Sequence, residues 1–307
     1  MGYMQQETND MKAGILFSII AYVLWGILPI YWDLIHGFDA FEILAYRIIL
    51  SMIFMLIVVS IGHYRRPFFE DVRFLFTTPT KLFALIIAGY VITLNWGTFI
   101  WAVTNGHVLQ TSLGYYINPL VNIVLAFIFL KERFNKPEWL AIILALIGVL
   151  YMTIQVGVFP IVSLLLAFTF GLYGLIKKLV PIHAISSITI ECIVTAPVAL
   201  IYIGYLFQQH ESAVGLNMST FLLLFSGALT AIPLILFSAG ARRIPLSLMG
   251  FIQYIGPTIM FVLGIFVFGE PFDMNQFITF IFIWLGILIY SFSQYLKMKH
   301  YRRALIK

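Results

Sequence analysis

Three charged residues stand inside long apolar stretches of the sequence. Glu42 and Arg47 lie five residues apart in one stretch, and Glu191 lies in the corresponding stretch of the second half of the chain. A charge surrounded by hydrocarbon is costly unless it is paired or hydrated, so such residues often mark pathways for substrates, ions or protons. These three residues are therefore the first candidates for a role in binding or moving a substrate, an ion or a proton.

Each of the three has a functional and a structural interpretation. Arg47 either faces a pore, where it would attract an anionic or carboxylated substrate, or ties helices together through an ion pair. A loose pair with Glu42 near the outer end of their helix would serve the second role. Glu191 is either a proton-coupling carboxylate or a group hydrated near the cytoplasmic headgroups. Glu42 and Glu191 are accordingly candidates for coupling or gating.

A second set of polar residues surrounds two prolines inside apolar runs, Pro119 and Pro257. A proline deprives a backbone carbonyl one turn earlier of its donor, and at membrane depth that carbonyl needs a neighbouring group or a hydrated cavity. The polar residues nearby either contact substrate or bond across helix interfaces. Both prolines are candidates for gating. The candidates for substrate binding are Tyr22, Trp25, Arg47, Asn95, Tyr115, Tyr116, Asn118, Asn122, Gln253 and Tyr254.

The composition predicts the elements that position these residues. Of 307 residues, 62% are hydrophobic and only 10% are charged, whereas a soluble domain carries about 25% charged residues. A helix needs about 20 mainly apolar residues to cross a membrane. We therefore predict an all-α integral membrane protein with ten transmembrane helices, at residues 13–31, 41–60, 82–101, 109–129, 137–153, 159–176, 185–207, 219–238, 248–268 and 275–294.

The basic residues predict the orientation of these helices. Alternate numbering of the loops places seventeen of the eighteen Lys and Arg residues on one side, and Arg47 is the exception. Because Lys and Arg collect in cytoplasmic loops, we predict a multi-pass plasma-membrane protein with both termini cytoplasmic. The stretch from His63 to Lys81 is predicted to be a surface-lying connector. Since the basic residues form no single stripe, we expect no nucleic-acid partner.

The two halves of the sequence repeat each other. An offset of 138 residues aligns residues 82–151 with 220–289, and a slightly larger offset aligns the first helices of the halves. Five helices per half is an odd number, so the second half must enter the membrane from the opposite side. Inverted repeats of this kind suit alternating access. We predict repeats at residues 1–153 and 154–307, with matched landmarks that include Gly89 and Gly227, Tyr116 and Tyr254, Pro119 and Pro257, and Glu132 and Glu270.

Sequence signatures of other chemistries are missing. The chain has no G-x-x-x-x-G-K-[ST] phosphate loop, no H-E-x-x-H pair and no G-x-S-x-G elbow, and Cys192 is its only cysteine. We therefore expect no ATP-driven pumping, metal site, cofactor or enzyme activity. The alternative is an intramembrane enzyme acting on lipid or lipid-linked substrates, with Glu42, Arg47 and Glu191 as its polar groups.

The runs Asn95–Val103 and Ser112–Leu120, followed by Glu132-Arg133, resemble the RarD branch of EamA-type transporters in the drug/metabolite transporter superfamily. The resemblance extends over the whole chain, including Gly14–Trp32 and the E-P-F turn at Glu270. It implies ten helices in two EamA repeats and a plasma-membrane permease, and branch members are often described as chloramphenicol permeases. The implied function is a secondary active or facilitative transporter exporting small metabolites or amphipathic drugs. Its partners would be a small-molecule substrate and the lipid bilayer, and no oligomeric state is implied.

Overall fold

The computed structural model is built from α-helices. It describes residues 2–61, 63–105, 107–157, 159–269 and 272–304, and no strand occurs among them. Outside the described part lie Glu270 and Pro271 of the predicted E-P-F turn, the tail residue Lys307, and the side chains of Lys299, Arg302 and Arg303. The helices are α1 (Gly2–Trp32), α2 (Ala40–Ile61), α3 (Arg65–Thr77), α4 (Pro79–Thr104), α5 (Val108–Phe129), α6 (Lys136–Val156), α7 (Ile161–Leu179), α8 (Ala184–Gln209), α9 (Met218–Arg243), α10 (Leu246–Gln253), α11 (Ile255–Phe266) and α12 (Met274–Ala304).

Ten segments in the described part of the chain are long and apolar enough to cross a membrane, as the sequence predicted. The ninth predicted span, residues 248–268, is interrupted, because α10 ends at Gln253 and α11 begins at Ile255. The ring of Pro257 clashes with a helical carbonyl at Gln253 and removes its donor. Its counterpart Pro119 lies inside the uninterrupted helix α5. Equivalent prolines in the two halves therefore have different effects on the backbone.

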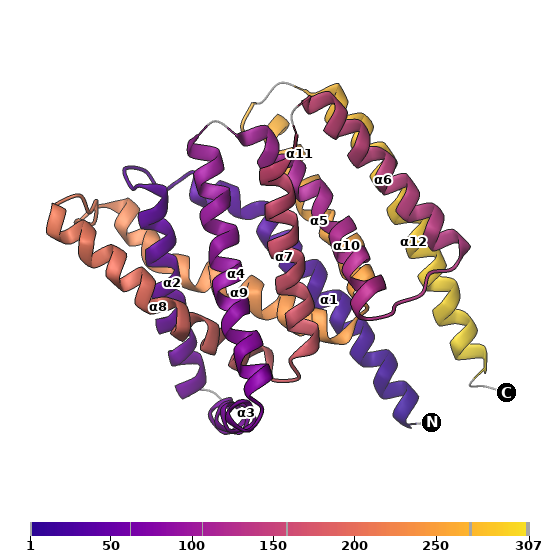
Figure 1. Cartoon of the computed structure of the whole chain (residues 1–307), viewed down its shortest axis with the longest axis horizontal. Helices are drawn as coiled ribbons and strands as arrows, with labels where there is room; N and C mark the ends of the chain where they lie inside the picture. The colour runs from indigo at the N-terminus through magenta and orange to yellow at the C-terminus, as the bar shows by residue number, and fades with distance from the viewer. Residues whose placement is uncertain (1, 62, 106, 158, 270–271, 305–307) are drawn as a thin grey trace.

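The helices pack as two related halves. Helix α2 packs on its counterpart α8 at one end of the molecule, and α6 packs on its counterpart α12 at the other (Figure 1). Helix α1 of the first half packs on α9 of the second, and the equivalent pair, α7 and α4, packs in the same way. Helices α1 and α7 begin at opposite ends of the bundle (Figure 1), so the two five-helix repeats are inverted, as predicted.

Two equivalent glycines lie at crossings between the halves. Gly227 of α9 lies against the backbone of Leu50 and Ser51 in α2, and the Ser51 hydroxyl donates a hydrogen bond of 3.0 Å to the Gly227 carbonyl. At the equivalent crossing, a Cβ on Gly89 of α4 would lie 3.2 Å from Thr195 of α8. Small residues of this kind let membrane helices approach closely.

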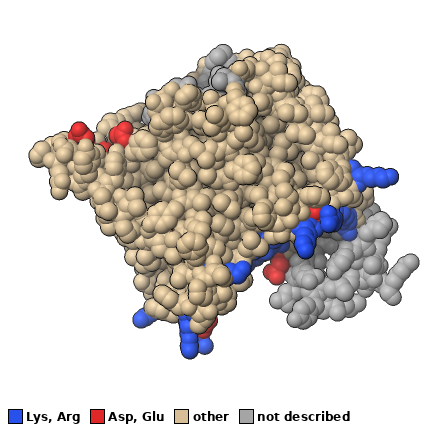
Figure 2. Space-filling view, in the orientation of Figure 1, with Lys and Arg blue, Asp and Glu red and all other residues tan. Residues whose placement is uncertain are grey.

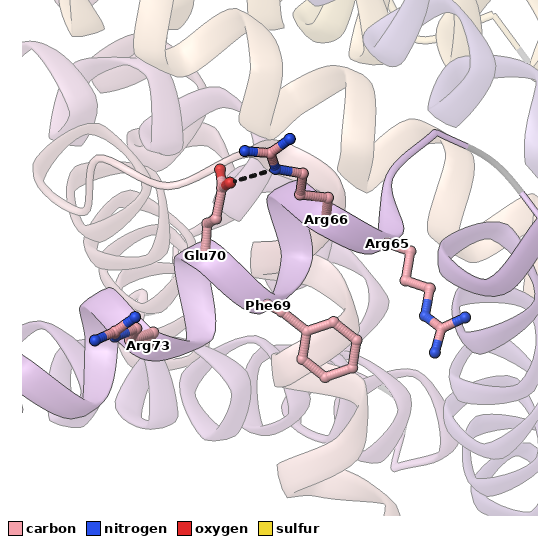
Figure 3. A pocket seen from close by; sticks show the side chains of 5 residues that line it. All are labelled: Arg65, Arg66, Phe69, Glu70 and Arg73. Atoms are coloured by element: carbon pink, nitrogen blue, oxygen red, sulfur yellow. Dashed lines mark hydrogen bonds and ion pairs between the residues drawn. The ribbon is translucent and has the colours of Figure 1, made fainter.

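The connector between the second and third spans is the short helix α3. It runs across the bundle, since Figure 1 shows it end-on near the end of the molecule that carries both termini. Its residue Asp71 accepts a hydrogen bond of 3.0 Å from the backbone of His183, directly before α8. Arg65, Arg66 and Arg73 project from it around Phe69 (Figure 3). Lys and Arg residues are concentrated at this end of the molecule (Figure 2).

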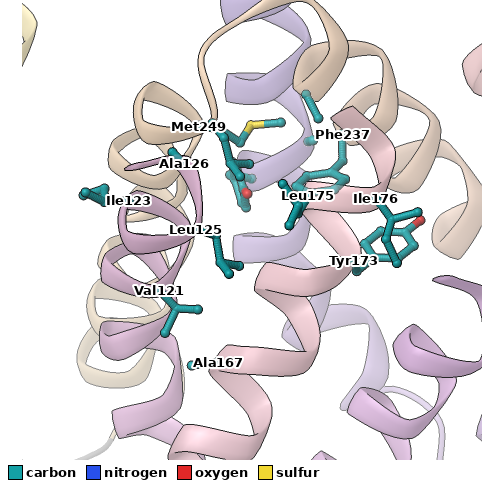
Figure 4. Close-up of a cluster of buried hydrophobic side chains, with 14 of the residues drawn as sticks. Val121, Ile123, Leu125, Ala126, Ala167, Tyr173, Leu175, Ile176, Phe237 and Met249 are labelled. Carbon is teal, nitrogen blue, oxygen red and sulfur yellow. The ribbon is translucent and has the colours of Figure 1, made fainter. Parts of the chain in front are cut away.

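Buried apolar side chains hold α5 of the first half against α7, α9 and α10 of the second. Leu125, Tyr173, Phe237 and Met249 belong to this cluster (Figure 4). A carboxylate adds a polar contact at its edge: Glu132, which follows α5, accepts hydrogen bonds from the backbone N–H groups of Leu246 (2.8 Å) and Ser247 (3.3 Å). These N–H groups at the start of α10 have no partner within their own helix. The shared landmark Glu132 therefore caps a helix of the opposite half.

Candidate functional site

A small cavity lies where the halves meet, between α2, α4, α8 and α9. Many of its lining residues are equivalent in the two repeats, being 144 residues apart on α2 and α8 and 138 residues apart on α4 and α9. The cavity therefore lies on the pseudo-twofold axis that relates the halves, and we call it the axial cavity. Its equivalent lining pairs are Ile48 and Cys192, Ser51 and Thr195, Ile92 and Thr230, and Trp96 and Leu234; Gly89, Thr93, Ile188 and Glu191 complete the lining.

The axial cavity is nearly closed. Its volume is about 20 Å³, which is room for about one water molecule. A substrate with several heavy atoms does not fit, so in this conformation the helices around the axis are packed together.

Arg47 lies in a group of residues beside the axial cavity. Its Nε donates a hydrogen bond of 3.0 Å to the hydroxyl of Thr230. Its guanidinium carbon lies 4.5 Å from the ring centre of Trp32 and 5.0 Å from that of Trp96, within the range of cation–π attraction. We call Arg47, Trp32, Trp96 and Thr230 the outer cluster. Thr230 and Trp96 connect it to the cavity, because both line the cavity.

The loose pair between Arg47 and Glu42 is not formed. Five residues of α-helix turn through about 140°, so the two side chains leave α2 in different directions. The Glu42 carboxylate instead accepts hydrogen bonds from the Ser212 hydroxyl (2.7 Å) and the Ala213 N–H (3.1 Å) in the loop after α8. In the part of the chain that the structure describes, no carboxylate lies within ion-pair distance of Arg47.

Glu191 lines the other side of the axial cavity and forms a buried ion pair with Lys177 of α7. The Ser187 hydroxyl joins them, accepting from Lys177 Nζ (2.7 Å) and donating to the carboxylate (3.0 Å). The Tyr173 hydroxyl donates to the other carboxylate oxygen (3.0 Å). We call Lys177, Glu191, Ser187 and Tyr173 the inner cluster. Glu191 is 3% exposed, and its carboxylate is bound by groups of the protein.

Sequence reasoning missed Lys177, which it assigned to a cytoplasmic loop. The residue lies within α7 and is 1% exposed. Two features of the sequence could have indicated that Lys177 faces the interior of the bundle. Successive helical residues point about 100° apart, so Lys177 and Lys178 do not share a direction. Tyr173 and Lys177 on one helix and Ser187 and Glu191 on the next are both spaced four residues apart, the spacing that places side chains on one helix face.

The outer and inner clusters occupy equivalent positions in the two repeats. Arg47 and Glu191 are each the eighth residue of their helices, α2 and α8, which places each about 10 Å from the helix start. Their partners Trp32 and Lys177 are 145 residues apart, the offset that aligns α1 with α7. Because the halves are inverted, the clusters lie toward opposite ends of the axis.

The residues around the broken helix form a separate polar contact. Asn122 Nδ2 donates a hydrogen bond of 2.8 Å to Gln253 Oε1, and the Tyr22 hydroxyl lies 3.5 Å from the same oxygen. The Tyr254 hydroxyl donates to the backbone carbonyl of Tyr116 (3.2 Å). These bonds join Gln253 of α10 to α1 and α5, and they join Tyr254, between α10 and α11, to α5. The side-chain carbonyl oxygens of Asn122 and of one further predicted residue, Asn118, are buried without a hydrogen-bond partner among the described residues.

The remaining predicted residues pack at helix interfaces. Asn95 donates to the Leu166 carbonyl (2.8 Å) and the Thr169 hydroxyl (2.7 Å), both on α7. Trp25 of α1 packs against the rings of Phe170 on α7 and Phe237 on α9, and Tyr115 packs against Phe99 on α4. Of all the predicted site residues, Glu191 lines the axial cavity and Arg47 reaches it through Thr230. The three charged groups of the enzyme alternative lie in separate contacts and do not meet.

Comparisons with known proteins agree with this architecture. The model of the EamA-like transporter family matches residues 12–154 and 159–292. The chain is 43% identical to "Protein RarD" of Escherichia coli over 92% of this chain and 95% of that protein. It is 41% identical to "Uncharacterized transporter YojE" of Bacillus subtilis over 93% of this chain and 95% of that protein. The "Chloramphenicol-sensitive protein RarD" of Pseudomonas aeruginosa is 29% identical over 95% of this chain and 98% of that protein.

A solved crystal structure shares the fold. It superposes with a TM-score of 0.71 at 14% sequence identity, over 92% of this chain and 97% of the other. At that identity the likeness concerns the fold alone. The family match covers most of both halves, and the RarD relatives align along nearly the whole sequence. The chain belongs to the EamA-like transporter family, as a homologue of RarD.

Proposed function

We propose that this membrane protein is a secondary transporter that works by alternating access, with its inverted halves moving about the axial cavity. The observation that carries the proposal is the position of that cavity. It lies on the pseudo-twofold axis, it is lined by equivalent residues of both halves, and a polar cluster lies toward each end. Two halves with similar packing can exchange conformations and open one central site to either side of the membrane.

The substrates we propose are small metabolites or amphipathic drugs, moved out of the cell across the plasma membrane. The name of one relative supports this, since the RarD protein of Pseudomonas aeruginosa is called chloramphenicol-sensitive. We further propose that both termini are cytoplasmic, because Lys and Arg are concentrated at the end of the molecule that carries them (Figure 2). Repeats at residues 1–153 and 154–307 are supported by the separate family matches to the two halves.

Transport assays test the proposal directly. Purified protein in liposomes should move at least one solute from a panel of metabolites and chloramphenicol-like compounds faster than protein-free liposomes do, with or without an imposed proton or sodium gradient. Movement of no solute under any gradient, by protein that elutes as one species in gel filtration, would contradict the proposal.

Cys192 offers a test of alternating access itself. It is the only cysteine of the chain and it lines the axial cavity. A charged, membrane-impermeant thiol reagent should reach it from one side of the membrane, and a transported solute should change the rate or the side of labelling. The matched control carries Cys192→Ser with Ile193→Cys, because Ile193 is the next residue and its side chain is exposed on the outer surface of the bundle. Labelling at equal rates for both proteins, unaffected by solute, would argue against an axial pathway.

A further inference from the structure

The outer cluster holds a positive charge that the protein does not neutralise. An arginine remains protonated at neutral pH and carries five N–H donors. In the described part of the chain, the only hydrogen bond that Arg47 donates goes from Nε to the uncharged hydroxyl of Thr230. The terminal nitrogens of its guanidinium have no acceptor there, and no carboxylate is within ion-pair distance.

The equivalent position in the second half shows what the outer cluster lacks. There the cation Lys177 meets the carboxylate of Glu191, and two hydroxyl groups complete the hydrogen bonds. At the inner cluster, the positive and negative groups of the protein therefore neutralise each other. At the outer cluster Trp32 takes the place of the lysine and Arg47 takes the place of the glutamate. A cation at membrane depth without a counter-charge is costly, and an anion that enters the site would remove that cost.

The surroundings of Arg47 also suit a particular kind of anion. Its guanidinium is a planar fork that binds a carboxylate through two parallel hydrogen bonds. The indole rings of Trp32 and Trp96 border the same group at 4.5 and 5.0 Å, and they offer flat apolar surfaces to the body of a ligand. Trp96 also lines the axial cavity, so a molecule bound at Arg47 lies at the edge of the proposed pathway.

We infer that the outer cluster is a substrate subsite for a carboxylate attached to a flat, apolar body. This inference rests on the proposed function, because it names the class of solute that the transport pathway would accept. Arg47 binds the carboxylate, and the two tryptophans contact the apolar body.

A pair of isosteric probes tests the inference on the intact protein. We would titrate purified protein in nanodiscs, in chloride-free buffer, with 4-bromobenzoate and with 4-bromobenzamide, and record tryptophan fluorescence. Bromine quenches an indole that it contacts, so a probe bound at the outer cluster gives a saturable loss of signal. Because a hydrogen bond to a charged group is worth more than a neutral one, the carboxylate should bind at least about tenfold more tightly than the amide.

Variants then locate the site. Arg47→Gln should abolish the preference for the carboxylate, whereas Arg47→Lys should keep part of it because the charge remains. Arg73→Gln is the matched control, since Arg73 lies on the surface of α3 (Figure 3) and its loss should change neither affinity. Addition of chloride should weaken the binding of 4-bromobenzoate only slightly; full competition at low millimolar chloride would identify a site for inorganic anions and overturn the substrate class.

Two further results would also overturn the inference. One is equal affinity of the wild-type protein for the two probes, which needs no variant and so does not depend on whether Arg47→Gln folds. The other is an unchanged preference in a folded Arg47→Gln protein. A failure of the proposed function can be distinguished from a failure of this inference. Absence of transport for every solute would contradict the proposed function, whereas transport of neutral solutes without any preference for carboxylates would contradict only this inference.

Discussion

The outer and inner clusters are built on the same scaffold and are neutralised differently. Arg47 and Glu191 occupy the same position in α2 and α8, and Trp32 and Lys177 occupy the same position in α1 and α7. The contact between the two positions is present in both halves, as a cation over an indole ring in one and as a buried ion pair in the other. The inverted repeat has therefore kept the packing of its helices while the chemistry at each end diverged.

That divergence matters for a transporter, because a pathway with identical ends would treat the two sides of the membrane alike. The inner cluster is closed by groups of the protein itself. The outer cluster leaves its charge available to a ligand. The difference between the two clusters is open to experiment, since it predicts unequal responses to equivalent substitutions.

The largest expected effect follows from breaking the inner ion pair. Lys177→Met leaves the buried Glu191 carboxylate without its cation and should lower the free energy of unfolding by about 3–5 kcal/mol. Arg47→Gln at the equivalent cluster leaves no charged group without its partner and should cost only about 1 kcal/mol. Denaturant unfolding in detergent micelles, followed by tryptophan fluorescence, measures both values.

Two further proteins control this comparison. The double variant Lys177→Met with Glu191→Gln removes both charges and should recover most of the lost stability. Lys178→Met changes the adjacent lysine, which donates to the Ile244 carbonyl and forms no ion pair among the described residues, and it should cost about 1 kcal/mol. If the double variant were no more stable than Lys177→Met alone, the ion pair would not be the source of the effect.

A smaller effect is expected at the glycine crossings on the two sides of the axial cavity. A Cβ on Gly227 would overlap the backbone of Leu50 and Ser51. That backbone lies within α2 and does not yield easily, so Gly227→Ala should cost about 1–3 kcal/mol. Gly89→Ala brings its Cβ to 3.2 Å from a Thr195 methyl group and should cost less than about 1 kcal/mol. The yield of monodisperse protein and its unfolding midpoint would show the order, and an equal loss at both positions would mean that the crossings are more alike than their geometry indicates.

The smallest effect concerns single hydroxyl groups. Tyr173→Phe removes one of three groups that contact the Glu191 carboxylate, and loss of a hydrogen bond to a charged group costs about 1.5 kcal/mol. Tyr22→Phe removes a longer contact, 3.5 Å from the uncharged amide of Gln253, and should cost about 0.5 kcal/mol. Thermal unfolding of the two variants side by side distinguishes these values, and a reversed order would place the stronger network at the broken helix.

The ten spans could be predicted from the sequence because apolar length is enough to define a membrane helix, and the inversion followed from an odd number of helices per half. The clusters could not be predicted in the same way. Whether Lys177 points to water or into the bundle depends on how α7 packs among α4, α5 and α9, which brings its side chain to Glu191 of α8. Which groups bind Glu42 depends on the loop that reaches it from the end of α8. Pro119 and Pro257 show the same limit, because identical residues at equivalent positions leave one helix intact and break the other.

For the predicted site residues, too, the sequence shows which residues are polar and the packing decides where they point. Polarity at membrane depth selected Arg47 and Glu191, since a charge in an apolar run is visible without any structure, and both lie beside the axial cavity. The same criterion also selected Asn95 and Gln253, which the structure places in bonds between helices. Depth in the sequence does not say which way a side chain faces, and only the packing of the two halves shows which polar residues border the axis.

The short helix α10 has a consequence for the way the halves could move. Its first N–H groups are bound by Glu132 and its last residue, Gln253, is bound by Asn122, and both of these partners flank or lie within α5 of the other half. The turn at Tyr254 interrupts the helix between α10 and α11. We therefore expect α10 to move together with α5. The two rigid bodies of a transport cycle would then not coincide with the two sequence repeats, because α10 of the second repeat would belong to the body that contains α5 of the first.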